Sequence, residues 1–166
     1  MIIDLQVACE NAQLPSLSQL QQWARLALQK GHTTEPDNTE ITIRIVEQRE
    51  SQELNLQYRS KDQPTNVLSF PFEQPVFDDP ALAAAMAQEL GDAVYLGDLV
   101  INADLVEQEA AQQSKSNQDH WAHLVIHGTL HLQGYDHIKD DEALIMETLE
   151  TQLLAQLNIA DPYIAK

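Results

Sequence analysis

With 166 residues, 43% of them hydrophobic, the chain can bury one core but is too short for two domains of ordinary size. It has no apolar run of about 18 residues and no basic region followed by an apolar one near its N-terminus, so neither membrane insertion nor secretion is expected. The net charge of −17 opposes general binding to a polyanion, so any contact with RNA requires a local basic patch. The single cysteine, Cys9, cannot form an internal disulfide, which suits the reducing cytoplasm.

The first part of the chain predicts two strands separated by a helix. Residues 2–8 alternate enough to indicate a first strand. A helix with an apolar stripe is predicted from Ser16 or Ser18, either of which can cap it, to about Lys30. Residues 40–47, EITIRIVE, alternate strictly between polar and apolar and give the clearest strand signal in the sequence.

The middle of the chain predicts shorter elements. A short helix over residues 52–58 precedes a strand at residues 66–70. Residues 71–92 are acidic and contain prolines, and we interpret them as a surface insertion with one short helix. The next strand, residues 93–101, is interrupted by Gly97, where we expect a bulge or a close approach of the backbone.

Three helices are predicted in the last third. Asn102 can cap a helix to about Ser114, and the helix that follows is apolar nearly all round apart from a histidine edge, so it should be central and buried. A last helix begins near Asp140. The residues expected to pack this last helix inward are Leu144, Ile145, Leu149, Leu153 and Leu157. Neither an internal repeat nor a linker is evident, so residues 1–166 are predicted to form one domain.

The stretch HLVIHGTLHLQGYDH, residues 123–137, has the spacing of a metal site. His127 and His131 are four residues apart and therefore lie on the same face of a helix. Gly134 can end that helix in the left-handed conformation, and the chain can then turn back and supply His137 as a third ligand. Three imidazoles leave one position of a tetrahedral ion open to water, which distinguishes catalytic zinc sites from structural ones.

The remaining histidines are expected to play lesser parts. His123 is rotated away from the edge formed by the two ligands, so we expect it to pack or to support a ligand. His120 is expected to face solvent or the rim of the cleft, and His32 to lie on the surface. A metallopeptidase with the same three ligands is an alternative, but such enzymes have a glutamate general base where this chain has Gly128.

A second stretch carries positive charge. Arg59 precedes a loop that Pro64 stiffens, and an arginine fork pairs well with phosphate oxygens. The alternative for this residue is a surface salt bridge with one of the many acids. Arg44, Arg49, Arg59 and Lys61 supply four of the nine cations, and we expect them to line an RNA-binding cleft.

Together these two stretches resemble the YbeY-type endoribonucleases, which are bacterial rRNA maturation factors. HGTLHLQGYDH matches every fixed position of that family's signature HGxLHLxGYDH. YRSKDQPTNVLSFPF is similar to its YRxxDxPTDVLSFP segment, and YLGDLVIN to its GDIxIs strand. The resemblance runs from about Ile41 to Leu157. The differences are Asn66, where the family usually has Asp, and the long acidic insertion after Phe72.

The resemblance implies an α+β fold with a small mixed sheet packed by helices. It implies a single-strand-specific, metal-dependent endoribonuclease that matures the 3′ end of small-subunit rRNA and acts in ribosome quality control. The implied metal ligands are His127, His131 and His137, and Arg59 is implied as a functional cation. The expected partners are single-stranded RNA and the small ribosomal subunit with its assembly factors, without DNA or a membrane.

We expect one ion per chain, and we expect it to be Zn²⁺. The bound ion would lower the pKa of a water molecule or polarise a phosphate oxygen. Arg59 would stabilise the charge that develops on the phosphate. Either water or the 2′-hydroxyl of the RNA could be the nucleophile. The other alternative is a non-enzymatic ribosome-assembly factor with a structural ion, which the acidic composition would also suit.

Overall fold

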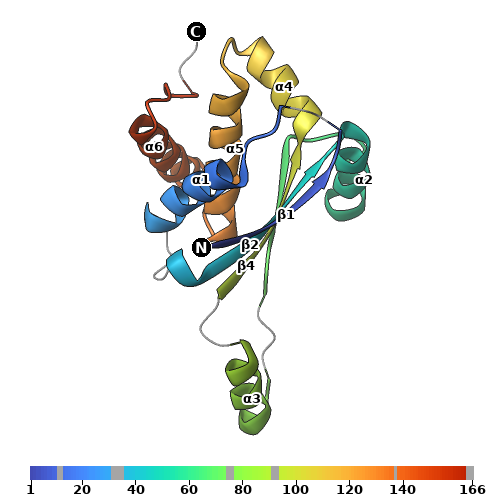
Figure 1. Cartoon of the computed structure of the whole chain (residues 1–166), viewed down its shortest axis with the longest axis vertical. Helices are drawn as coiled ribbons and strands as arrows, with labels where there is room; N and C mark the ends of the chain where they lie inside the picture. The colour runs from blue at the N-terminus through green and yellow to red at the C-terminus, as the bar shows by residue number, and fades with distance from the viewer. Residues whose placement is uncertain (11–12, 31–35, 74–76, 91–93, 137, 164–166) are drawn as a thin grey trace.

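The computed structural model describes residues 1–10, 13–30, 36–73, 77–90, 94–136 and 138–163. In this part of the chain, one four-stranded sheet and six α-helices form a single α+β domain (Figure 1). The predicted fold class is therefore confirmed. None of the helices in these residues has both the length and the apolar character needed to cross a membrane.

The sheet is mixed, as predicted. Its strands are β1 Ile2–Ala8, β2 Thr39–Val46, β3 Val67–Pro71 and β4 Val94–Asn102. They lie in the order β1-β2-β4-β3, with β1 and β4 both parallel to β2 and with β3 antiparallel to β4. The alternation predicted for β2 is confirmed, because Ile41, Ile43 and Ile45 are fully buried while Arg44 lies on the other face.

The helices are distributed unequally over the two faces of the sheet. Their bounds are α1 Leu17–Lys30, α2 Gln48–Arg59, α3 Pro80–Leu90, α4 Ala103–Gln112, α5 Asn117–Leu132 and α6 Asp140–Gln156, with a 3-10 turn at Pro36–Asn38. In Figure 1, α1, α5 and α6 lie together on one side of the sheet, α2 lies on the other, and α3 stands apart beyond one end. Helix α5 packs on α1, α4, α6 and the sheet, so it is the central helix of the fold.

Helix α5 lies close against the strands beneath it. Of its 16 residues, 10 are buried, which confirms the prediction of a central buried helix. A Cβ added at Gly128 would come within 2.8 Å of a methyl carbon of Leu99 on β4. The glycine thus allows the helix to approach the sheet more closely than a larger residue would.

Local signals in the sequence place several element ends correctly. The Ser16 hydroxyl accepts a hydrogen bond from the Gln19 amide (3.2 Å), and the Asn102 side chain caps α4. Gly97 has a φ of +141°, and the pairing of β2 with β4 shifts register beside it. The predicted irregularity at Gly97 is therefore confirmed.

Two predictions about helices are wrong in detail. Helix α2 begins at Gln48 rather than at residue 52, and its first turn is bonded to β2 through Arg44 and Glu50. In α6, Leu144 and Ile145 are 66% and 56% exposed instead of packed inward. The buried face of α6 consists of Met146, Glu150, Leu153 and Leu154. The prediction is confirmed for Leu153, which is fully buried, and for Leu149 and Leu157, which pack against the core. The buried stripe includes a carboxylate, so an apolar count alone placed Leu144 and Ile145 on the wrong side.

Candidate metal centre

The histidine edge of α5 forms part of a cavity of about 750 Å³. His127 and His131 both line it, with ring centres 4.7 Å apart. Because residues four apart lie one turn above each other, both imidazoles reach the same space. The structure brings together two of the three histidines that the spacing predicts as ligands.

The third predicted ligand, His137, lies outside the described residues, as does His32. Helix α5 ends as expected, with Gly134 in the left-handed region (φ +100°) and its amide bonded to the His131 carbonyl (3.0 Å). Gly134, Tyr135 and Asp136 then line the histidine cavity. A three-histidine ligand set therefore stays a prediction.

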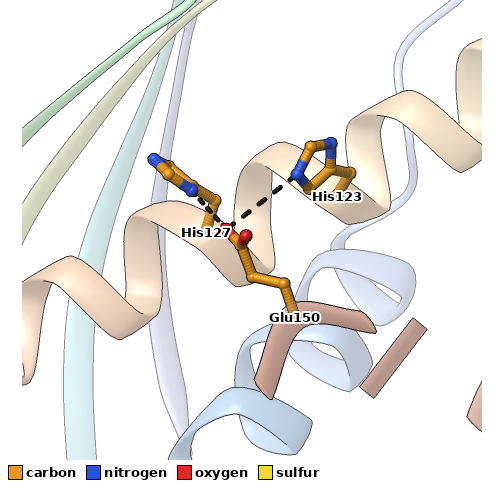
Figure 2. Close-up of side chains that lie close together, drawn as sticks. All are labelled: His123, His127 and Glu150. Carbon is orange, nitrogen blue, oxygen red and sulfur yellow. Dashed lines mark hydrogen bonds and ion pairs between the residues drawn. The ribbon is translucent and has the colours of Figure 1, made fainter. Parts of the chain in front are cut away.

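A buried carboxylate from α6 contacts one of the predicted ligands, His127, and also lies near His123. Nδ1 of His127 is hydrogen-bonded to Oε1 of Glu150, whose side chain is fully buried. Nε2 of His123 lies 3.9 Å from the same oxygen. One donor atom from each of His123, His127 and Glu150 lies within 4.8 Å of the other two, so this group could hold a metal ion (Figure 2).

The two candidate ligand groups use different nitrogens of His127. In Figure 2, Nδ1 points to Glu150 and the other ring nitrogen lies on the far side of the ring. Histidines that bind metals commonly donate their second N–H to a carboxylate, which orients the ring. The bond to Glu150 therefore fits a His127 that binds an ion through Nε2 beside His131, and imidazole nitrogens are donors that zinc prefers.

The charge states of these groups agree with that arrangement. Burial by itself would raise the pKa of the Glu150 carboxyl, but the hydrogen bonds from His127 and Tyr163, together with the charge interactions with the histidines, outweigh it and hold the pKa below its usual value. Burial lowers the pKa of His123 to about 4, so this ring is neutral near pH 7. An ionised Glu150 can only accept hydrogen bonds, so His127 must be the donor in their contact.

Arg59 lies on the wall of the histidine cavity. It is the last residue of α2, and its Nη2 donates to the Ser69 carbonyl of β3 (2.9 Å). Its guanidinium carbon is 5.6 Å from the centre of the Phe70 ring. These contacts position a permanent positive charge in the cavity that contains His127 and His131.

The predicted cleft of four cations is wrong. Arg59 and Lys61 line the histidine cavity. Arg44 instead lines a separate cavity, where it bonds to Glu50 (2.6 Å), and the side chain of Arg49 is 92% exposed beside Glu53. Sequence proximity did not place these residues together, because Arg44 lies on β2, whereas Arg49 and Arg59 lie near opposite ends of α2.

Asn66 connects the cavity to a second polar group. Its Nδ2 donates to Glu109 (3.3 Å), and the other Glu109 oxygen lies 3.4 Å from Nε2 of His120. Burial would raise the pKa of Glu109, but the hydrogen bonds from His120 and Asn66 prevail and lower it. His120 is only 2% exposed, so the expectation that it faces solvent or the cleft rim is wrong.

Sequence reasoning missed Glu150 as a contact of the candidate ligands. The residue belongs to a markedly acidic helix, so its charge suggested a solvated position. Its place on the stripe between Met146 and Leu153 was the available signal, because those two neighbours are buried.

Comparisons with known proteins support one family. The model of the family described as "Endoribonuclease YbeY" matches residues 6–158. The solution structure of TM1509 from Thermotoga maritima is similar, with a TM-score of 0.52 and 20% sequence identity over 97% of this chain and 99% of that chain. At this level of identity, the structural likeness concerns the fold alone.

Proposed function

Because the chain belongs to the YbeY endoribonuclease family, we propose that it is a metal-dependent endoribonuclease that cleaves single-stranded RNA. Its proposed task in the cytoplasm is to mature the 3′ end of small-subunit rRNA, with a part in ribosome quality control. The small ribosomal subunit and its assembly factors would then be its partners. The observation that carries this proposal is the single cavity that contains His127, His131 and Arg59.

We assign the ion to His127, His131 and His137, with Zn²⁺ as the metal. When bound there, zinc would supply a Lewis acid for a phosphate oxygen or lower the pKa of a water molecule. The chain contributes the two rings on α5, and the Glu150 carboxylate directs one of them. The position of a peptidase general base is occupied by Gly128, and a side chain there would require the methyl groups of Leu99 to shift.

Arg59 is proposed to bind the phosphate that is cleaved. The guanidinium group of Arg59 can donate hydrogen bonds to two phosphate oxygens. Its positive charge would stabilise the negative charge that develops on the phosphate in the transition state. Lys61 adds a second cation to the same wall. Single-stranded RNA is the proposed substrate because the resemblance to the YbeY-type endoribonucleases implies it.

The segment from residue 71 to residue 92 is proposed to be a surface insertion. Its helix α3 stands apart from the other helices in Figure 1. We assign it no part in the chemistry.

The role of Arg59 can be tested by reversing its charge. Arg59→Glu is expected to lower the rate of cleavage of a single-stranded RNA by at least about 100-fold, because a transition-state contact is lost. Its zinc content, measured by elemental analysis, should equal that of the wild type. Arg49→Glu is the matched control, since Arg49 is exposed outside the cavity and should tolerate the change. Unchanged cleavage in Arg59→Glu, or loss of its zinc, would contradict the assignment.

A further inference from the structure

A hydrogen-bonded chain connects the C-terminal segment to the proposed metal ligand. The Tyr163 hydroxyl donates to Oε2 of Glu150, and the other oxygen, Oε1, accepts from Nδ1 of His127. We infer that Tyr163 and Glu150 are positioning residues that fix His127 with Nε2 directed to the ion. This inference rests on the metal site of the proposed function. Tyr163 lies beyond the residues that the family model matches.

Glu150 can perform this role because each of its oxygens is bonded. Its side chain is fully buried, and a buried carboxylate is costly unless hydrogen bonds compensate it. With Tyr163 on one oxygen and His127 on the other, the carboxylate is held in one orientation. A histidine that donates through Nδ1 keeps its lone pair on Nε2, which is the tautomer that a metal ligand needs.

The hydroxyl of Tyr163 also determines the part played by His123. Nε2 of His123 lies 3.3 Å from this hydroxyl, and Nδ1 of the same ring is buried without a hydrogen-bond partner among the residues that the structure describes. A neutral imidazole has one N–H, so a His123 that donates through Nε2 has no lone pair there for an ion. Tyr163 therefore opposes metal binding by the group of His123, His127 and Glu150.

The C-terminal segment is anchored so that Tyr163 can reach Glu150. Oδ1 of Asp161 accepts from the Tyr163 amide (2.8 Å) and lies 3.4 Å from the Thr151 hydroxyl on α6. The Tyr163 ring meets His123 edge to face, with ring centres 5.6 Å apart. The segment after α6 is thereby tied back to the helix that carries Glu150.

The test measures the affinity for zinc alone, by competition with a chromophoric chelator on the metal-free full chain. Glu150→Gln is expected to weaken zinc binding about 10- to 100-fold, the usual cost of losing a carboxylate behind a histidine ligand. Tyr163→Phe should weaken it by a smaller factor. The double variant should bind zinc as Glu150→Gln does, because Tyr163 acts through Glu150.

Matched controls separate positioning from a general effect on structure. Tyr58→Phe removes a phenol hydroxyl on the other face of the sheet, and Glu142→Gln removes a carboxylate from the same helix as Glu150. Both should bind zinc like the wild type. Nitrogen-15 NMR of the His127 ring should report a single tautomer, protonated at Nδ1, in the wild type and a mixture of tautomers in Tyr163→Phe.

Several results would overturn the inference. Tyr163→Phe loses only one hydroxyl and should fold, so unchanged affinity and an unchanged tautomer in it would exclude positioning by Tyr163. If the fold-loss of zinc affinity in the double variant equals the product of the fold-losses in the two single variants, the two residues act separately. Loss of zinc from His123→Ala but not from His131→Ala would place the ion in the other group. A wild type that shows the expected zinc results but does not cleave RNA would instead refute the proposed function alone and leave this inference standing.

Discussion

Asn66 illustrates how one residue can depend on its structural neighbours. Its amide donates to Glu109, which also lies against the buried His120. The aspartate that the YbeY-type segment usually has here would place two carboxylates side by side. An amide avoids this repulsion and keeps the hydrogen bond.

Asn66→Asp is therefore expected to lower the free energy of unfolding at pH 7 by about 1 kcal/mol, because a hydrogen bond is replaced by like-charge contact. Urea denaturation measures the change. Adding Glu109→Gln should restore most of the loss, since the new pair can again share a hydrogen bond. Equal losses in the single and double variants would contradict a direct interaction between the two positions.

At the scale of the elements, the first turn of α2 is joined to the sheet by an ion pair. Arg44 on β2 donates to both oxygens of Glu50, at 2.6 Å from Nε and 2.9 Å from Nη2. The hydrogen bond from Arg44 lowers the pKa of the Glu50 carboxyl. A group whose pKa is lowered on folding stabilises the fold above its unfolded pKa and loses that contribution as the pH falls through its folded pKa.

Glu50→Gln should consequently reduce the free energy of unfolding at pH 7 by about 0.5 kcal/mol, a value typical of a partly exposed pair. The difference from the wild type should shrink as the pH falls below about 4.3, where Glu50 begins to be protonated in the unfolded chain. Thermal unfolding at a series of pH values measures both. A difference that persists at low pH would show that Glu50 acts by packing rather than by charge.

Most elements could be predicted because their signals are local. The alternation in β2, the caps at Ser16 and Asn102 and the glycine after α5 depend on residues close in sequence. The buried face of α6 depends on distant partners. Its three buried apolar residues and one buried carboxylate fit α5 only in the phase that buries Glu150, and no local pattern indicates that His127 lies opposite.

In the candidate site, too, only the features that depend on residues close in sequence could be predicted. Helical spacing alone brings His127 and His131 to one face. Arg59 lines their cavity because the end of α2 contacts β3 at Ser69, whereas Arg44 on β2 lines a separate cavity and Arg49 is exposed. Composition does not reveal this arrangement.

At the scale of the whole molecule, charge restricts where RNA can bind. The chain has a net charge of −17, so long-range attraction cannot guide a polyanion to most of its surface. Arg59 and Lys61 line the cavity that also contains His127 and His131. RNA binding and cleavage are thus expected to occur in the same small region. We therefore expect RNA cleavage to depend strongly on the bound metal.

The most direct test is elemental analysis of the wild type, His131→Ala and His123→Ala, with a single-stranded RNA cleavage assay on each sample. We expect one equivalent of zinc and cleavage in the wild type, loss of both in His131→Ala, and retained zinc in His123→Ala. Zinc that persists in His131→Ala but is lost from His123→Ala would contradict the assigned ligands. Cleavage that persists in His131→Ala without metal would contradict a metal-dependent nuclease at this site.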